Sequence, residues 1–340
     1  MSAGTSAPKS RAPRSRALAV GKLVRLSLLP SALADAVCGV ALGGVFAAAV
    51  DGAGVAAGDA EFDAWPGPIV LLALLVSACL FHGGMALNDW ADRAEDARLE
   101  RDRPLPNGDL SPSFALGLAV SLFAIGVAAA ASVSWRGAVA AASVAACAAA
   151  YDLVGRGPLR GPLLLALCRA GNLATAAWIG ASATGAELRF DRLVPIALAY
   201  ALYVFTLSRL GRMEDDETRE PGGRPRPILV VLAVLLASAP VVAFASVVLG
   251  GAATPDTLHW VAFLVGAGLA WHGARPLLVE ARARSTWSRG EVMRAMGLVL
   301  RRLALFTCTV TFGLGEPLLG AAILLAYPLG ARLRKVFPPS

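Results

Sequence analysis

Apolar residues run along this chain in long continuous blocks rather than at the spacing of a half-exposed helix or strand. The blocks are rich in Ala, Leu, Val and Gly, and short segments with charged residues, Pro and Gly separate them. A helix needs about 20 apolar residues to cross the hydrocarbon core of a bilayer. Strict alternation of apolar and polar residues, which is typical of membrane barrel strands, does not occur. The pattern therefore predicts an all-α, polytopic membrane helical bundle.

The blocks predict ten spans. They cover 26–50, 67–88, 113–133, 136–151, 161–183, 193–208, 227–250, 258–272, 293–313 and 317–332. Because the block at 136–151 is short and the one at 258–272 begins with His259 and Trp260, nine spans with one re-entrant or interfacial segment is the alternative. The spans form a single domain over residues 25–335. Residues 1–24 are rich in Ser, Ala, Pro, Lys and Arg and lack an apolar core, so we expect a disordered basic tail rather than a signal peptide.

Charge supports this interpretation and sets an orientation. Only 16% of the residues are charged, against about 25% in a soluble domain. Arg136, Arg189 and Arg192 fall in loops on one side, and Arg169, Arg301 and Arg302 fall within spans. The other 25 of the 31 basic residues lie on the side of the N-terminus. Positive loops face the cytoplasm, so we expect a multi-pass protein of the cell membrane with a cytoplasmic N-terminus. The net charge of +7 then reflects membrane lipids as partners and not nucleic acid.

Cysteine and histidine give no sign of a soft-metal site. The five cysteines, Cys38, Cys79, Cys147, Cys168 and Cys308, lie inside apolar blocks and are interpreted as small buried residues. The three histidines, His82, His259 and His272, are scattered along the chain. Neither a Walker-type loop nor a Rossmann fingerprint occurs, so no nucleotide site is expected.

The largest polar feature closes the second span. Asn88, Asp89, Asp92 and Asp96 fall within an arc of about 100° if the helix continues past the membrane surface. Four oxygen-bearing side chains on one face repel one another unless a cation lies among them, and Mg²⁺ prefers such ligands together with substrate phosphates. The alternative is a solvated acidic helix end with Arg93 and Arg98 as ion-pair partners.

The residues that follow favour a phosphate ligand. Arg101 and Arg103 come directly before the rigid segment Pro104-Leu-Pro-Asn-Gly108. Arginine forks suit phosphate oxygens, and Pro and Gly hold a loop in a defined shape. Carboxylates and arginines beside a membrane therefore indicate a metal-bridged diphosphate more than a bare cation site.

This segment resembles a known family motif. Asn88-Asp89-x-x-Asp92-x-x-x-Asp96, followed by Arg103-Pro-Leu-Pro-Asn-Gly108, is similar to the first motif of the UbiA superfamily of membrane prenyltransferases. That motif reads NDxxDxxxD and then RPxxSG, between the second and third helices. The resemblance covers residues 25–335 and implies a UbiA-like bundle that uses Mg²⁺ and a polyprenyl diphosphate. It implies no protein partner.

The family's second acidic motif, on the loop after the sixth helix, is irregular here. The loop contains Glu214, Asp215 and Asp216, and Asp216 stands four residues before Glu220. Gly211 and Arg212 occupy the positions that would complete aspartate pairs, so a solvated loop is the alternative to a second metal site.

The resemblance implies roles for further residues near the same membrane side. Tyr151, Arg156, Arg169, Asn172 and Arg209 are expected to contact the diphosphate, as are Asn88, Arg101 and Arg103. The expected metal ligands are Asn88, Asp89, Asp92, Asp96, Glu214, Asp215 and Asp216, and the expected catalytic carboxylates are Asp92, Asp96 and Asp216. Asp35 is a lone carboxylate inside the first span, so it should face a cavity or a partner. A narrower resemblance, to the EboC-like bacterial branch, rests on Asp35, Tyr151-Asp152, Cys168-Arg169-x-x-Asn172 and Ser208-Arg209.

The function that follows is Mg²⁺-dependent transfer of a prenyl group to a lipophilic or aromatic acceptor at the cytoplasmic side of the membrane. Two alternatives stay open: a UbiA-like protein that binds the lipid or prenyl diphosphate without catalysis, and a small-molecule transporter. A transporter should carry its carboxylates at mid-membrane, where only Asp35 lies.

Overall fold

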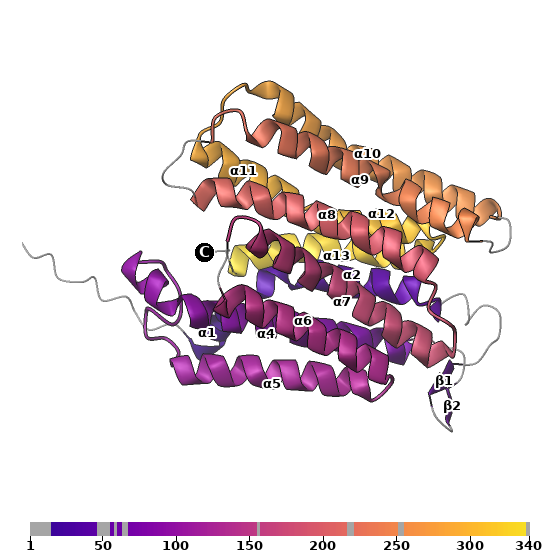
Figure 1. Cartoon of the computed structure of the whole chain (residues 1–340), viewed down its shortest axis with the longest axis horizontal. Helices are drawn as coiled ribbons and strands as arrows, with labels where there is room; N and C mark the ends of the chain where they lie inside the picture. Colours follow the sequence, from indigo (N-terminus) through magenta and orange to yellow (C-terminus); the bar gives the residue numbers. More distant parts are fainter. Residues whose placement is uncertain are drawn as a thin grey trace, which may run out of the picture.

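The computed structural model describes residues 15–45, 55–57, 60–62, 67–154, 157–215, 221–250 and 255–337. In this part of the chain the structure is a bundle of long antiparallel helices (Figure 1). In chain order the elements are α1 (Arg16–Leu23), a 3₁₀ turn (Leu26–Leu28), α2 (Leu29–Leu42), β1 (Val55–Ala57), β2 (Ala60–Phe62), α4 (Gly67–Arg98), α5 (Pro112–Ala131), α6 (Trp135–Leu153), α7 (Arg160–Thr184), α8 (Phe190–Asp215), α9 (Pro225–Leu249), α10 (Thr257–Ala283), α11 (Arg289–Leu300), α12 (Leu303–Gly313) and α13 (Pro317–Val336).

Fewer helices than predicted meet the length and composition of a membrane span. Seven described helices do so, or eight if the bent pair formed by α1 and the segment Leu26–Leu42 counts as one span. Seven or eight of the nine or ten predicted spans therefore meet this criterion in the described part of the chain. Helix α6 and the apolar part of α13, Pro317–Gly330, lie beside the other helices in the bundle but do not meet it. Helix α6 carries the charged residues Arg136 and Asp152 near its ends and is rich in Ala between them, so its mean hydropathy is low.

The first span differs from its prediction. Residues 16–23, expected in a disordered tail, form α1, and α1 meets the segment Leu26–Leu42 at an angle of 51°. Arg25 lies at the bend in a left-handed conformation, with a φ of 50°. Helix α2 then ends at Leu42, before the predicted end at residue 50. Its Gly43 packs so closely on α7 that an added Cβ would come within 2.7 Å of the Ala177 carbonyl oxygen.

Helix α4 continues past the predicted end of its span. It runs unbroken through Asn88 and Asp96 to Arg98, so the helical spacing assumed for the polar motif is confirmed. Glu100, with a φ of 51°, then turns the chain into the loop that leads to α5. We call the end of the bundle at which α4, α6, α8 and α10 finish the motif end. The described start and end of the chain both lie there (Figure 1).

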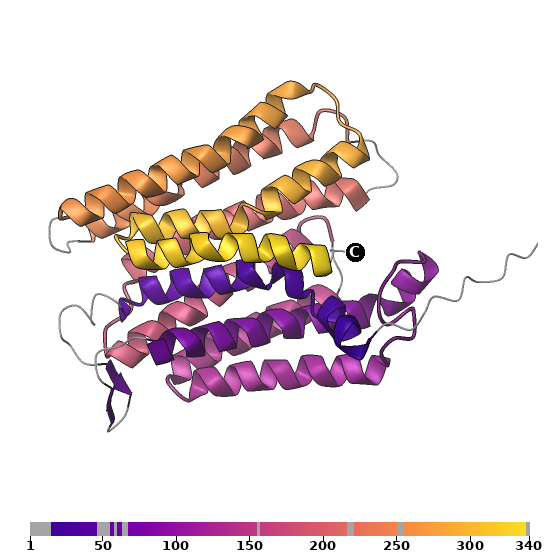
Figure 2. The ribbon, with the colours of Figure 1, turned by 180° about the vertical axis from the view of Figure 1, so that it is seen from behind.

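Helices α2 and α7 lie at the centre of the bundle. Helix α2 contacts α4 and α7 on one side and α12 and α13 on the other, whereas α7 contacts α6 and α8 (Figure 2). In the second half, α10 extends to Ala283, beyond the predicted end at residue 272. The predicted span 293–313 lies within Arg289–Gly313, which is one of the seven helices of span length. The helix is interrupted inside it after Leu300, where the Arg302 guanidinium donates to the carbonyl oxygens of Gly273 and Leu298, both at 2.7 Å.

Candidate functional site

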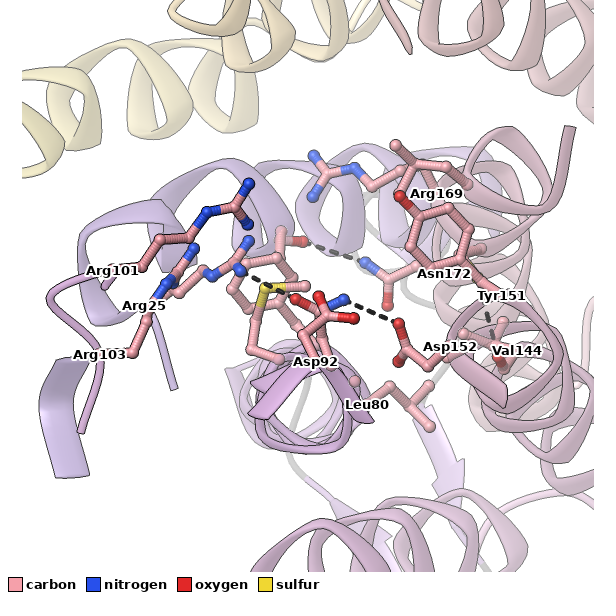
Figure 3. Close-up of a pocket in the computed structure, with 18 residues that line it drawn as sticks. Arg25, Leu80, Asp92, Arg101, Arg103, Val144, Tyr151, Asp152, Arg169 and Asn172 are labelled. Atoms are coloured by element: carbon pink, nitrogen blue, oxygen red, sulfur yellow. Dashed lines mark hydrogen bonds between the residues drawn. The ribbon is translucent and has the colours of Figure 1, made fainter. Parts of the chain in front are cut away.

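A pocket of about 290 Å³ opens toward the motif end between α2, α4, α6 and α7. Its mouth is polar, and Figure 3 shows Arg25, Arg101 and Arg103 on one side of Asp92, with Asp152 on the other. Its deeper wall is apolar and is formed by Ala32, Leu80, Phe81, Met85, Val144, Ala148 and Leu165. The pocket thus combines a charged entrance with an apolar interior.

The motif on α4 divides between this pocket and the neighbouring arginines. Asn88 and Asp92 line the pocket. Asp89 and Asp96 lie at the other edge of the same arc and are 2% exposed. A helical step of about 100° per residue explains the division, because Asn88 and Asp92 stand about 40° apart whereas Asp89 and Asp96 follow at larger angles. The four side chains share a face, as predicted, but they do not gather around one point.

Arginines neutralise the two carboxylates that turn away from the pocket. Arg103 lies 3.5 Å from Asp89 Oδ1 and 3.9 Å from Asp96 Oδ2. The Arg101 guanidinium is 3.1 Å from Asp96 Oδ1. Burial lowers the pKa of Arg103, and Arg25 nearby lowers it further, although the two aspartates offset part of this effect. Arg101 and Arg103, which are predicted to contact the diphosphate, thus lie beside the acidic motif and pair with its buried carboxylates.

Arg25 is a site residue that the sequence analysis missed. Its guanidinium donates to Asn88 Oδ1 at 2.8 Å and to Asp89 Oδ1 at 3.3 Å. Asn88 in turn donates from Nδ2 to Asp152 Oδ1 at 2.8 Å. A polar chain therefore crosses the pocket mouth from the first span to α6. In the sequence, Arg25 is one of many basic residues that indicate the orientation in the membrane. Only the bend after α1 brings it to the motif.

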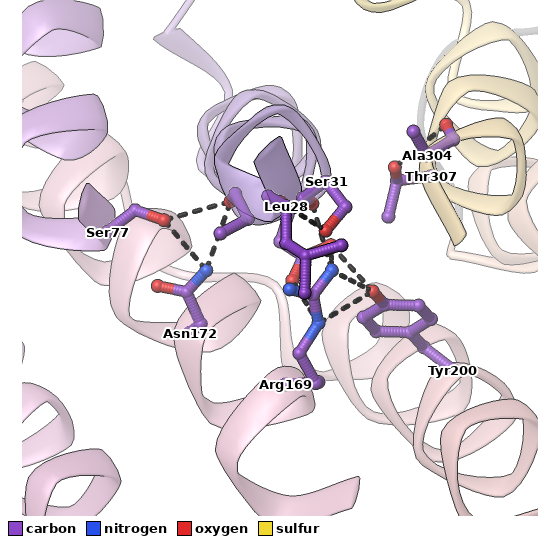
Figure 4. Close-up of polar contacts among 10 residues, drawn as sticks. Leu28, Ser31, Ser77, Arg169, Asn172, Tyr200, Ala304 and Thr307 are labelled. Atoms are coloured by element: carbon purple, nitrogen blue, oxygen red, sulfur yellow. Dashed lines mark hydrogen bonds and ion pairs between the residues drawn. The ribbon is translucent and has the colours of Figure 1, made fainter. Parts of the chain in front are cut away.

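Arg169 and Asn172 line the pocket as predicted, but their hydrogen bonds are to protein groups (Figure 4). Arg169 is 3.0 Å from Asp35 Oδ2 and donates to the Tyr200 hydroxyl at 3.0 Å and the Ser31 carbonyl at 2.9 Å. The Tyr200 hydroxyl donates to Asp35 Oδ1 at 2.6 Å. The expectation that Asp35 faces a partner is confirmed, and the guanidinium of Arg169 is held by that partner.

The second acidic segment lies only partly within the described residues. Helix α8 ends at Asp215, the side chains of Glu214 and Asp215 are not described, and residues 216–220, with Asp216, lie outside the described range. Arg209 donates to the Pro158 carbonyl oxygen at 2.7 Å, so it holds the loop before α7. Among the described residues that line the pocket, none belongs to α8. Tyr151 lines the pocket as predicted, whereas Arg156 also lies outside the described range.

The donor set at the mouth fits magnesium held together with phosphate. Asn88, Asp92 and Asp152 place an amide and two carboxylates around the pocket. Asn172 Oδ1, in the pocket lining, is buried and has no hydrogen-bond partner among the described residues. Within that same part of the chain, no three His, Cys, Asp or Glu side chains come close enough to hold a metal by themselves. Mg²⁺ is commonly bound by one or two carboxylates plus substrate phosphates and water, and the mouth offers that many.

Comparison with known proteins places the chain among membrane prenyltransferases. A family model described as the UbiA prenyltransferase family matches residues 41–294. The bacteriochlorophyll synthase 33 kDa chain of Cereibacter sphaeroides is 31% identical over 182 residues, 49% of this chain and 57% of that protein. Digeranylgeranylglyceryl phosphate synthase of Natronomonas pharaonis is 32% identical over 163 residues, 46% and 56% of the two chains. The matched region spans little more than half of each relative.

A solved structure shares the fold. The UbiA homologue from Archaeoglobus fulgidus bound to DMAPP and Mg²⁺ aligns with a TM-score of 0.52 and 19% sequence identity. The alignment covers 87% of this chain and 99% of that one. The same homologue has been solved with GPP and Mg²⁺. At this identity the likeness concerns the fold, and the all-α membrane bundle is thereby confirmed.

Proposed function

This chain is a multi-pass membrane protein of the UbiA prenyltransferase family, and from that premise we propose that it transfers a prenyl group from a polyprenyl diphosphate to a lipophilic or aromatic acceptor. The observation that carries the proposal is the pocket itself, in which three arginines and Asp92 stand over an apolar interior. A prenyl diphosphate has the matching form, with an anionic head and an apolar chain.

Different residues at the pocket mouth bind the phosphate oxygens and the metal of the diphosphate head group. Arg25, Arg101 and Arg103 supply guanidinium forks, which bind phosphate oxygens in pairs. Asn88 and Asp92 are the α4 ligands for Mg²⁺. When bound, the metal neutralises the negative charge that grows on the departing diphosphate. Asp89 and Asp96 act through the arginines, because each is paired with Arg103.

The apolar interior serves the other half of the substrate. Leu80, Phe81 and Val144 surround the space next to the polar mouth. The allylic carbon of a prenyl diphosphate becomes cationic as its bond to oxygen breaks, and apolar walls keep water away from it. Asp216 stays a predicted catalytic residue, and the resemblance to the EboC-like branch stays a prediction about the subgroup.

Orientation belongs to the same proposal. The motif end carries the excess of basic residues, so we place it in the cytoplasm. A transporter would need carboxylates along a path through the membrane. Asp35 has no exposed surface and is paired with Arg169, which counts against that alternative. A UbiA-like protein that binds without catalysis differs from the enzyme only in product formation.

Binding and transfer can be measured separately on the purified protein in lipid nanodiscs. We expect radiolabelled GPP to bind with Mg²⁺ and not with EDTA, and labelled lipid product to form when a membrane extract supplies the acceptor. Asp92→Asn should strongly reduce both signals. Asp102→Asn is the matched control, because Asp102 lies on the following loop, pairs with Lys22 at 3.5 Å and does not line the pocket. Binding of GPP without Mg²⁺, or by Asp92→Asn at the wild-type level, would contradict the proposal.

A further inference from the structure

The pocket is lined by an acidic residue for which the family resemblance implies no metal-binding role. Asp152 stands at the end of α6, on the side of the pocket opposite Arg25 and Arg101 (Figure 3). Its Oδ1 accepts a hydrogen bond of 2.8 Å from Asn88 Nδ2. Because Asn88 precedes Asp92 by one helical turn, this bond holds the end of α6 against the part of α4 that carries the metal-binding motif.

A second observation points to a ligand at the same place. Asn172 on α7 is 6% exposed, and its Nδ2 donates to Ser77 Oγ at 2.9 Å and to the Ala32 carbonyl oxygen at 3.2 Å. Those two acceptors fix which end of the amide is the oxygen. Asn172 Oδ1 is buried and has no hydrogen-bond partner among the described residues. In Figure 3 this oxygen points to the side of the pocket where Asp92 and Asp152 lie. A buried acceptor without a donor costs free energy unless a ligand completes it.

From these contacts we propose that Asp152 and Asn172 are oxygen ligands of the metal–diphosphate complex, across the pocket from Asp92. The proposal rests on the proposed function, because it requires that a prenyl diphosphate binds there with Mg²⁺. Asp152 adds a carboxylate on α6 to the ligands that the resemblance assigns to α4 and to the second acidic segment. Asp152 and Asn172 come from α6 and α7, which lie beside α4 in the bundle.

The chemistry of the set suits Mg²⁺. The cation needs six oxygens in near-octahedral geometry and keeps few protein ligands. Asp92 and Asp152 supply two carboxylates, Asn88 and Asn172 supply neutral oxygens, and the diphosphate and water supply the rest. The arginines on the opposite side are then left to bind the remaining phosphate oxygens. By contrast, Arg209 and Arg212 at the end of α8 donate to the carbonyl oxygens of Pro158 and Gly157, so this end of α8 contacts the loop before α7.

The first test is the Mg²⁺ requirement of GPP binding. We expect Asp152→Asn to raise the Mg²⁺ concentration for half-maximal binding about tenfold or more, since loss even of a group that only orients a metal ligand typically costs about 10- to 100-fold in metal affinity. Binding of Mn²⁺ alone, followed by loss of its free EPR signal, should weaken in parallel. If Asp216→Asn shifts these values and Asp152→Asn does not, the proposal is overturned. If the wild-type protein shows no Mg²⁺-dependent GPP binding, the proposed function fails instead.

A change of metal preference tests ligation apart from folding. In a Cys168→Ala background, Asp152→Cys should bind GPP better with Cd²⁺ than with Mg²⁺, because thiolate selects the softer ion. A folded variant that keeps the Mg²⁺ preference would contradict ligation by Asp152. For Asn172 the pair is Asn172→Leu and Ser77→Ala. Both disturb the same hydrogen bonds, but only the first removes Oδ1, so only the first should raise the Mg²⁺ requirement. Equal Mg²⁺ requirements in the two variants would contradict ligation by Asn172.

Discussion

Two clusters of buried charge in this protein use the same residue types for different ends. In the interior cluster, Asp35 is bound by Arg169 and Tyr200 and has no exposed surface. In the mouth cluster, Asp89 is shared by Arg25 and Arg103, whose side chains are 27% and 10% exposed. The interior cluster reaches the pocket wall only through Arg169, whose guanidinium is held by Asp35, whereas the mouth cluster places Arg25 and Arg103 at the pocket entrance. Burial of a charge in a membrane bundle therefore does not by itself mark a substrate site.

The difference lies in what remains unsatisfied. Asp35 Oδ1 accepts from the Arg169 guanidinium and from the Tyr200 hydroxyl. Asp35 Oδ2 makes no hydrogen bond among the described residues, but it lies 3.0 Å from Arg169 Nε, within the same ion pair. In the mouth, Arg103 Nε, Arg25 Nε and Asp89 Oδ2 are buried and lack a hydrogen-bond partner among the described residues. A ligand bound at the mouth could supply the hydrogen-bond partners that these buried atoms lack. We infer that the interior cluster fixes α2 to α7 and α8, and that the mouth cluster binds the diphosphate group of the substrate.

The largest effect on stability should come from breaking the interior pair. Asp35→Asn leaves the Arg169 charge buried without its counter-ion, which typically costs about 3–5 kcal/mol. We expect a large loss of thermal stability in detergent, measured by the unfolding of helices. Replacing both partners, Asp35→Leu with Arg169→Met, should recover most of it. If Asp35→Asn alone is as stable as the wild type, the proposed structural role of the pair is contradicted.

The opposite pattern is expected at the mouth. Asp92→Asn should weaken Mg²⁺-dependent GPP binding by about 100-fold, because a carboxylate is a principal ligand of a hard cation. Its free energy of unfolding should change by less than about 1 kcal/mol, as is usual for a site outside the core. Calorimetric titration and thermal unfolding of the same sample measure the two quantities. If Asp92→Asn unfolds the protein as Asp35→Asn does, the two clusters are not distinct.

Arg25 provides a smaller, more selective comparison. Arg25→Gln removes the fork that contacts Asn88 and Asp89, and we expect about 10- to 100-fold weaker GPP binding, since charge-assisted hydrogen bonds contribute strongly. Lys22→Gln is the matched control, because Lys22 also lies near the start of the chain but pairs with Asp102 away from the pocket. Equal effects of the two substitutions on binding would indicate that only the overall positive charge matters.

The smallest effect concerns a carboxylate that pairs with neither cluster. Glu316 lies between α12 and α13, where burial raises its pKa from 4.5 to about 7 and His259 offsets part of the rise. A raised pKa means that the folded state holds the proton more tightly. The stabilisation is therefore complete below pH 4.5 and is lost as the pH rises through about 7. Glu316→Gln should flatten the dependence of the melting temperature on pH in this window, and an unchanged slope would contradict the burial effect.

The sequence was sufficient for the bundle and for the first motif, because both depend on local spacing. Apolar blocks predict helices wherever they occur, and Asn88, Asp92 and Asp96 keep their positions on α4. Length and hydropathy alone recover seven or eight of the predicted spans, since an Ala-rich segment such as α6 is apolar without being strongly hydrophobic. The roles of Arg25, Arg169 and Asp152 depend on contacts between residues 63 or more positions apart. Spacing within one helix gives no information on such contacts.

The central claim is that the prenyl diphosphate and its metal bind in the pocket beside Asp92. An experimental structure of the protein with Mn²⁺ and a non-hydrolysable thio analogue of GPP tests it most directly, because anomalous scattering locates the metal. We predict a metal peak between Asp92, Asp152 and the diphosphate, with the guanidinium groups of Arg25 and Arg103 on the phosphate oxygens. A peak at Glu214–Asp216, with an empty pocket beside Asp92, would contradict the claim.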